Sequence, residues 1–177
     1  MLDSKNFTKY LNRHEIDAAV LSLANRLNDR YKDKEVVMVG VLKGSVLFLA
    51  DLVRAIKFDP KIEFVRMVSY GKTKESLGTI SFLKDIHTDL HGKDVLIVAE
   101  IVDSARTLRF LYDRVMKAEP ASCEIVTLLD KTNKRAVDLP VNFVGVKTND
   151  QFLVGYGLDL EEQNRNLPDI YYLKYPN

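Results

Sequence analysis

VLIVAEIVDSARTL, residues 95–108, begins with the most apolar strand candidate of this 177-residue chain and runs into a helical pattern. A short, continuous apolar run is typical of a strand that is buried on both faces of a sheet. Small, acidic and hydroxylated residues follow it, and helical spacing continues from Arg106 to Lys117, before Pro120. The stretch therefore predicts a strand, a short loop and a helix, which is the repeating unit of parallel α/β sheets.

The same alternation of helices and strands extends to both sides of this unit. Apolar residues at spacings of three and four predict helices, and short Val-rich runs predict strands. The further predicted elements are helices at 13–33 and 46–56 and strands at 36–42, 62–68, 124–129 and 141–146. We expect an α/β fold in which helices flank a mainly parallel, twisted sheet, formed as a single domain over residues 1–177.

A long polar stretch between Gly71 and Lys93 breaks this rhythm. Loops of this length inside a compact domain are usually functional lids or flaps. Residues 79–83 are suited to one arm of a hairpin. We therefore expect a mobile flap over about residues 70–92.

The charge balance and the cysteine content exclude several classes of protein. Lys and Arg number 26 and Asp and Glu 25, whereas a general polyanion binder carries a large basic surplus. The single cysteine, Cys123, cannot form an internal disulfide and is expected to be buried at the start of a strand. No apolar run reaches the roughly 18–20 residues that a membrane span needs, and the N-terminus lacks a signal-peptide pattern. We expect a cytoplasmic protein that binds neither membrane nor nucleic acid.

The polar residues that follow the strands predict where a ligand binds. In open parallel sheets, ligands bind beyond the carboxyl ends of the strands. The loop from Asp103 to Thr107 offers hydroxyl groups and the N-terminus of a helix, which together suit a phosphate. The alternative is an ordinary helix cap at Asp103 or Ser104 with no ligand. Lys43 with Gly44, Lys131 and the segment after Val146 end at the same edge of the predicted sheet.

Residues 95–108 resemble the 5-phosphoribosyl-1-pyrophosphate (PRPP) motif of type I phosphoribosyltransferases, and the whole chain resembles the hypoxanthine and hypoxanthine-guanine members of that family. The similarity spans about residues 36–167, and no single segment carries it alone. The other matching segments are Val41-Leu42-Lys43-Gly44, Ser69-Tyr70-Gly71, Leu128-Leu129-Asp130-Lys131, Phe152 to Asp159, and Arg165. They resemble, in that order, the pyrophosphate loop, the start of the mobile flap, the purine-recognising lysine segment, the purine-stacking and metal segment, and a pyrophosphate-binding arginine.

This resemblance implies a purine salvage enzyme, a glycosyltransferase that joins a 6-oxopurine to PRPP and releases pyrophosphate. Asp103 would be the general acid/base at the purine N7. The 5′-phosphate and ribose would be held by Glu100, Ser104, Ala105, Arg106 and Thr107. Lys43, Gly44 and Arg165 would bind pyrophosphate, with a strained or cis peptide between Lys43 and Gly44.

The purine and metal contacts are implied in the same way. Lys131 would donate to the purine O6, Ile101 and Phe152 would stack on the base, and the main chain near Leu153 would meet its edge. Glu100 and Asp159 would serve Mg²⁺, which prefers oxygen ligands and substrate phosphates. Ser69 and Tyr70 would begin the flap, the N- and C-terminal segments would form a small hood, and the protein would be a homodimer or homotetramer.

Taken singly, three of these residues have simpler interpretations. Phe152 would be ordinary core, Lys131 a solvated residue at a strand end, and Arg165 the ion-pair partner of Glu161. Only their joint placement favours the functional interpretation over these alternatives.

The chain departs from the family pattern inside the PRPP motif itself. The family usually has Glu-Asp where this chain has Ala99-Glu100, and Gly where it has Ala105. These changes predict weaker PRPP binding, and they leave open a catalytically weak relative that acts as a nucleotide- or PRPP-binding regulator. An RNA-binding regulator on the same fold is a further alternative, against which the near-neutral composition argues.

Overall fold

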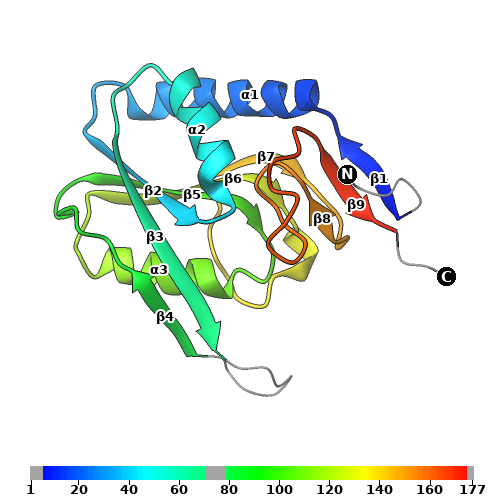
Figure 1. Cartoon of the computed structure of the whole chain (residues 1–177). Coiled ribbons are helices and arrows are strands. Elements are labelled where there is room, and N and C mark those ends of the chain that lie inside the picture. Colours follow the sequence, from blue (N-terminus) through cyan, green and yellow to red (C-terminus); the bar gives the residue numbers. More distant parts are fainter. Residues whose placement is uncertain (1–5, 71–78, 175–177) are drawn as a thin grey trace.

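The computed structural model describes residues 6–70 and 79–174, and its centre is a six-stranded sheet (Figure 1). Only β3 and β4 are antiparallel, and every other neighbouring pair is parallel. In spatial order the strands are β4 (Thr79–Lys84), β3 (Lys61–Tyr70), β2 (Val36–Leu42), β5 (Asp94–Val102), β6 (Ser122–Asp130) and β7 (Phe143–Lys147). The expected α/β fold with a mainly parallel sheet is thereby confirmed.

Helices cover both faces of this sheet, as Figure 1 shows. On one face, α1 (Arg13–Tyr31) and α2 (Ser45–Ala55) pack on Met38, Leu96 and Val98. On the other, α3 (Arg106–Met116) packs on alternate residues of the same strands, including Val39 and Ile97. Both faces of the central strands are therefore buried, which explains why their sequences are continuous apolar runs.

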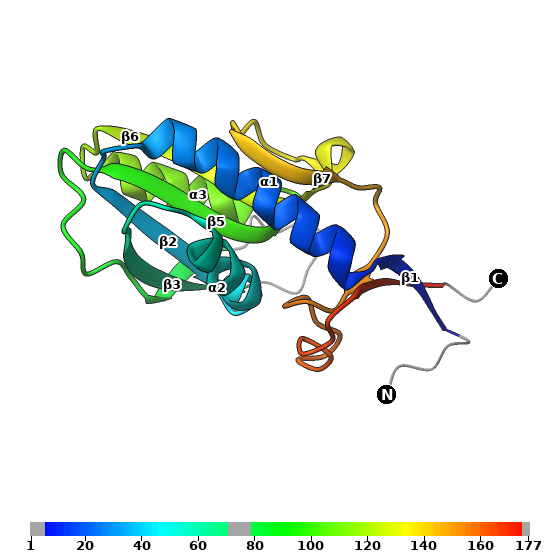
Figure 2. The same ribbon diagram turned by 90° about the horizontal axis from the view of Figure 1, so that it is seen from above.

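A second, three-stranded sheet combines the two ends of the chain, and Figure 2 shows it at one end of the molecule. Its antiparallel strands are β1 (Phe7–Leu11), β9 (Ile170–Leu173) and β8 (Leu153–Val154). Asp169, just before β9, pairs with Lys9 at 2.6 Å and accepts the Arg13 backbone N–H at 2.8 Å. These contacts fasten the small sheet to the start of α1.

The predicted elements agree with the structure in type and order, with a few differences. Strands β1 and β8 and the short 3-10 helix η1 (Thr132–Lys134) were not expected. Of the expected flap, residues 71–78 lie outside the described residues, as do the side chains of Ser69 and Tyr70. Cys123 is free and half-buried rather than buried, and burial raises the pKa of its thiol to about 12. None of the described helices is long and apolar enough to cross a membrane.

Candidate active site

Asp103 stands where β5 ends, facing two lysines. Its Oδ2 lies 3.4 Å from Lys131 Nζ and 3.5 Å from Lys134 Nζ. Its Oδ1 is buried and has no hydrogen-bond partner among the described residues. Lys131 is 5% exposed and its backbone N–H donates to Val102, so it is not a solvated strand-end lysine. Asp103 thus has one oxygen beside two cations and one that is free to accept a proton or a hydrogen bond.

The loop after Asp103 forms a small hollow at the N-terminus of α3. Its volume is about 150 Å³, and its lining is Ile101, Asp103, Ser104, Ala105, Thr107 and Leu108. No side chain caps α3, which leaves its first N–H groups without a side-chain acceptor, and a helix N-terminus of this kind favours a phosphate. The alternative of an ordinary side-chain cap is therefore wrong. A larger cavity, about 570 Å³, lies at the far end of α1 and contains none of the expected site residues.

Ala105 adopts a left-handed backbone conformation, with φ at 64°. Glycine reaches this region without strain, whereas an alanine is disfavoured there. The backbone of this chain thus has the shape that the family's glycine would adopt most easily, and alanine occupies it.

The loop after β2 brings a second set of groups to the same end of the sheet. The peptide bond between Leu42 and Lys43 is cis, one residue earlier than the expected Lys43–Gly44 bond. A Cβ at Gly44 would collide with the Glu100 carboxylate, which would have to move aside. Gly157 has no room for a Cβ, because it lies against the Gly44 carbonyl oxygen. These close contacts hold the loop, the end of β5 and the segment after β8 together.

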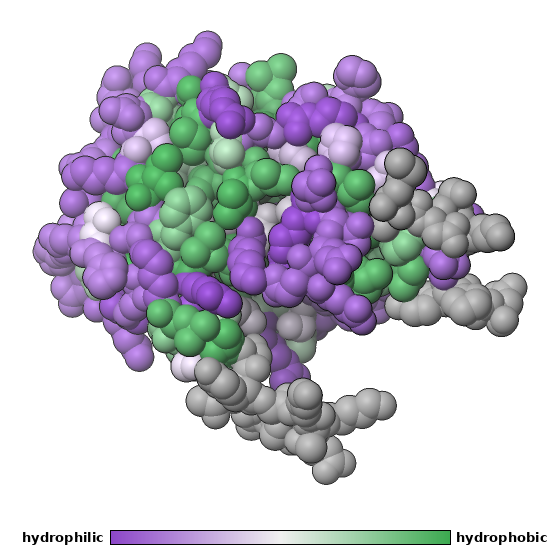
Figure 3. Space-filling view, in the orientation of Figure 1, coloured by the Kyte–Doolittle hydropathy of each residue, from purple (hydrophilic) through white to green (hydrophobic). Residues whose placement is uncertain are grey.

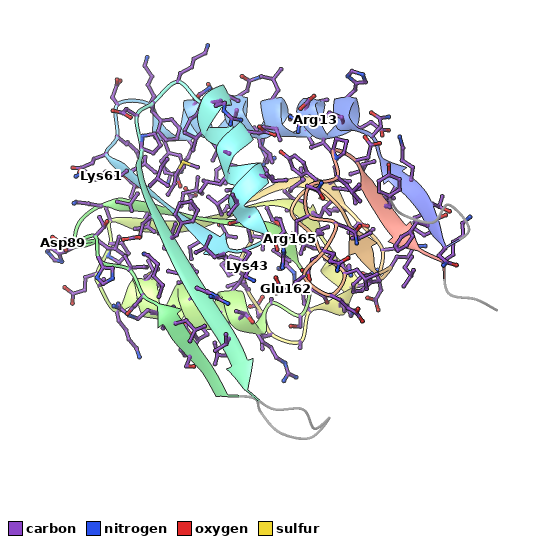
Figure 4. The ribbon with its side chains drawn as sticks, in the orientation of Figure 1. Arg13, Lys43, Lys61, Asp89, Glu162 and Arg165 are labelled. Atoms are coloured by element: carbon purple, nitrogen blue, oxygen red, sulfur yellow. The ribbon has the colours of Figure 1, made fainter. Side chains whose placement is uncertain are left out.

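Arg165 is held at the edge of this cluster by three oxygens. Its guanidinium lies 2.8 Å from Asp159 Oδ1, donates to the Gly157 carbonyl at 2.8 Å and reaches Glu162 Oε2 at 3.3 Å. The alternative prediction, that Arg165 pairs with Glu161, is therefore wrong. The Arg165 Nε is buried without a partner among the described residues. Figure 4 shows Lys43, Glu162 and Arg165 side by side.

Glu100 and Ala99 lie on opposite faces of β5. Ala99 is 2% exposed and belongs to the apolar cluster on the α3 side. Glu100 faces Gly44, near Asp159 and Arg165. Burial raises the pKa of Glu100 to about 7, although a hydrogen bond from its own backbone N–H and the charge of Arg165 oppose this, and nearby Asp159 adds to it.

Of the expected purine residues, Lys131 and Ile101 lie beside Asp103. Phe152 is 37% exposed and therefore not part of the core, whereas the adjacent Leu153 is buried in β8. Ile101 is half-buried beside Asp103. Sequence reasoning missed Lys134, which also pairs with Asp150 at 2.6 Å, and Glu162. The i,i+3 spacing of Glu162 to Arg165 and of Lys131 to Lys134 is a local signal for both residues, whereas the contacts of Glu162 with Lys43 and of Lys134 with Asp103 join separate loops.

Comparison with known proteins shows which family this chain belongs to. The model of the phosphoribosyl transferase domain family matches residues 6–161. A hypoxanthine phosphoribosyltransferase of Salmonella typhimurium is 43% identical over 158 residues, which covers 88% of this chain and 89% of the relative. The chain belongs to the phosphoribosyltransferase family. A hypoxanthine-guanine phosphoribosyltransferase of Aquifex aeolicus is 41% identical and covers 94% of both chains.

Solved phosphoribosyltransferase structures share the fold closely. A hypoxanthine phosphoribosyltransferase from Staphylococcus aureus superposes with a TM-score of 0.91 at 39% identity, over 96% of this chain and 94% of that one. A hypoxanthine-guanine phosphoribosyltransferase from Bacillus anthracis gives 0.88 at 38% identity, over 98% and 100%. The family resemblance inferred from the motifs is confirmed.

The carboxylates of this phosphoribosyltransferase fit a metal that draws most of its ligands from substrate. Among the described residues, no three His, Cys, Asp or Glu side chains converge as a metal site. Glu100 and Asp159 lie near each other at the crevice, and both offer oxygen ligands. Mg²⁺ commonly binds through one or two carboxylates together with substrate phosphates, so the residues present are compatible with it.

Proposed function

We propose that this protein transfers the phosphoribosyl group of PRPP to a 6-oxopurine, hypoxanthine or guanine, and releases pyrophosphate. The observation that carries this proposal is Asp103, whose Oδ1 is buried and unpartnered while Oδ2 faces Lys131 and Lys134. It lies at the mouth of a phosphate-sized hollow. A carboxylate so placed suits proton transfer at the purine N7.

The reaction exchanges one bond at the ribose for another. The purine N9 bonds to C1 as the bond from C1 to the pyrophosphate oxygen breaks, and Asp103 Oδ1 accepts the N7 proton. The N–H groups at the start of α3, with Ser104, Arg106 and Thr107, hold the 5′-phosphate. Holding the purine and PRPP in line for the reaction lowers the activation barrier, because the entropy of bringing them together has already been lost on binding.

Purine selection rests on Lys131. Its buried ammonium donates to the O6 of a 6-oxopurine, whereas the 6-amino group of adenine would present a donor to a donor. Phe152, with Ile101, offers the apolar surface on which the base stacks, and the main chain of Leu153 meets the base edge.

A third group of residues is assigned to pyrophosphate and its metal. Lys43, Gly44 and Arg165 would bind the pyrophosphate, and Glu100 and Asp159 would hold Mg²⁺, which would neutralise part of the phosphate charge. Ser69 and Tyr70 would lead into the expected flap of about residues 70–92, part of which lies outside the described residues, and the small sheet of β1, β8 and β9 would form the hood over the purine.

The partners of this chain are PRPP, the purine base and further copies of itself. We expect a homodimer or homotetramer in the cytoplasm. Figure 3 shows apolar side chains gathered over α2 and β3, where Val46, Leu47 and Ile62 are 36–48% exposed. A large exposed apolar patch is typical of a contact surface. Light scattering during size-exclusion chromatography checks the expectation, and a monomer at micromolar concentration contradicts it.

The enzyme assay tests the proposal directly. Hypoxanthine, guanine, xanthine and adenine are each incubated with PRPP and Mg²⁺, and nucleotide is separated by chromatography. We expect nucleotide from the 6-oxopurines and little from adenine. Asp103→Asn removes the proton acceptor, so turnover should fall by about 10²–10⁴-fold while both substrates still bind. Binding without any turnover in the wild-type protein would favour the regulator instead.

A further inference from the structure

The carboxylate of Glu162 occupies the two cations that pyrophosphate needs. Its Oε2 lies 2.6 Å from Lys43 Nζ and 3.3 Å from Arg165 Nη2. Figure 4 shows the three side chains converging from the loop after β2 and from the segment after β8. The hydrogen bonds from Lys43 and Arg165 lower the pKa of Glu162, so the group is an anion at neutral pH.

The turn that carries Glu162 has an unusual backbone. Leu160 and Gln163 exchange two backbone hydrogen bonds, at 3.2 and 3.0 Å, which closes a two-residue turn. Between them Glu161 and Glu162 have φ of 51° and 65°. Two successive positive φ values define a type I′ turn, for which Asn-Gly is the favoured sequence. Two glutamates in these positions are strained, and such strain concentrates at functional sites.

The turn is also fixed in the orientation that aims Glu162 at the crevice. The Glu162 backbone N–H donates to Asp159 Oδ2 at 2.9 Å, and Asp159 Oδ1 holds Arg165 at 2.8 Å. Glu161, by contrast, is exposed, and its side chain forms no ion pair with any residue that the structure describes. The two adjacent glutamates therefore share a backbone conformation and a charge, but only Glu162 contacts the cations.

We propose that Glu162 is a built-in competitor for pyrophosphate, which leaves Lys43 and Arg165 when PRPP binds and returns when pyrophosphate departs. The inference rests on the proposed function, because that function assigns both cations to pyrophosphate. Pyrophosphate carries more charge than one carboxylate and offers more oxygens, so it displaces Glu162. The displaced carboxylate still lies near the anion and repels it, which weakens the binding of PRPP and of the released product.

The buried Nε of Arg165 supports the same exchange. Glu162 and Asp159 engage the Nη2 edge of the guanidinium, and the Gly157 carbonyl engages Nη1. Nε has no partner among the described residues. Since a phosphate can accept from two guanidinium nitrogens at once, it offers Arg165 a hydrogen bond that the single oxygen of Glu162 does not.

Calorimetric titration with inorganic pyrophosphate at fixed Mg²⁺ tests the proposal. In Glu162→Gln we expect the dissociation constant for pyrophosphate to fall about three- to tenfold, and the KM for PRPP to fall with it while the purine KM is unchanged. Glu161→Gln is the matched control: it removes an equal charge from the same turn and should change the dissociation constant less than twofold. Glu162→Asn, which suits the left-handed conformation, should behave like Glu162→Gln and separates the charge effect from any folding defect.

Two more variants separate failure of this inference from failure of the proposed function. Lys43→Met and Arg165→Gln should each weaken pyrophosphate binding by tenfold or more. If they do so while Glu162→Gln binds no tighter than Glu161→Gln, the competitor role is overturned and the pyrophosphate site stands. If neither weakens binding, the pyrophosphate site itself is wrong, and the competitor role falls with it.

Discussion

Two partly buried glutamates show how differently the same side chain behaves at the base of the flap and in the crevice. Glu63, on β3, accepts from Lys84 Nζ at 2.6 Å and from the backbone N–H groups of Phe64, His87 and Thr88. Burial alone would raise its pKa, but these hydrogen bonds outweigh burial and lower the pKa to about 2. Burial dominates at Glu100, whose pKa is raised to about 7.

The difference lies in the partners, because both carboxylates lose contact with water. Around Glu63 the segment after β4 supplies donors that satisfy the charge, so the glutamate fastens the base of the hairpin formed by β3 and β4. At Glu100 burial outweighs the hydrogen bond from the residue's own backbone N–H and the charge of Arg165, and Asp159 raises the pKa further. A carboxylate without enough donors is unfavourable for folding and favourable for binding a cation.

The largest effect is expected from Glu63→Gln. The substitution removes the charge that Lys84 and three N–H groups stabilise, so the free energy of unfolding at pH 7 should fall by about 2–4 kcal/mol. Because the folded pKa lies below the usual 4.5, this stability is present above about pH 4.5 and is lost as the pH falls through 2. The difference between wild type and variant should therefore shrink in acid, as measured by urea denaturation.

A matched control for Glu63 is Glu35→Gln. Glu35 also pairs with a lysine at 2.6 Å, but both side chains are 58% exposed. Exposed pairs contribute little, so Glu35→Gln should leave the midpoint of urea denaturation nearly unchanged. Equal losses in the two variants would show that burial and the backbone donors add nothing at Glu63.

Glu100→Gln is expected to raise the free energy of unfolding at alkaline pH, whereas Glu63→Gln lowers it. Because the folded pKa of about 7 exceeds the usual 4.5, the stability tied to the protonated group is full below pH 4.5 and lost as the pH rises through 7. A glutamine never ionises, so the variant should be more stable than wild type by about 1–3 kcal/mol at pH 8 and nearly equal to it at pH 5. Urea denaturation at both values checks this.

The same substitution that stabilises the fold at pH 8 should weaken the binding of PRPP with Mg²⁺. Glu100→Gln removes a carboxylate that we assign to the metal, so calorimetry at pH 8 should show weaker binding of PRPP in the presence of Mg²⁺. If Glu100→Gln gains no stability at pH 8, ionised Glu100 does not destabilise the fold. If the variant also binds PRPP as before, Glu100 does not hold the metal.

Features that depend on neighbouring residues were predictable from the sequence, and features that depend on contacts between distant segments were not. Strand and helix periodicity predicted the α/β order, because residues such as Val95–Val98 and Leu108–Val115 report local burial directly. Strands β1 and β8 were missed because each is short and takes its stability from pairing with β9, far along the chain. The family motifs named Asp103 with Lys131 and Asp159 with Arg165, two pairs that the structure brings together.

The contacts within the site were less predictable. Apart from the adjacent Phe64 N–H, the donors to Glu63 come from a segment more than twenty residues away, and Glu162 reaches Lys43 across 119 positions. Spacing alone allowed Arg165 to pair with either Glu161 or Glu162, and the turn geometry decides in favour of Glu162. The face of Ala99 is likewise a result of the strand's pairing, and it places any acid at that position on the opposite side from Glu100.

The smallest effect on stability is expected from Ala105→Gly, which tests backbone strain rather than charge in the same crevice. Relief of the positive φ stabilises by about 1–2 kcal/mol, but loss of the buried methyl group costs about 0.8 kcal/mol and the added freedom of the unfolded chain up to about 1 kcal/mol. These terms offset each other, so the free energy of unfolding should change by less than about 1 kcal/mol. Removing the methyl group lets a phosphate approach the backbone more closely, so PRPP affinity measured by calorimetry should rise a few-fold. A large loss of stability with unchanged PRPP affinity would contradict this prediction. It would show that the Ala105 methyl group stabilises the apolar cluster beneath α3 and does not limit phosphate binding in the crevice.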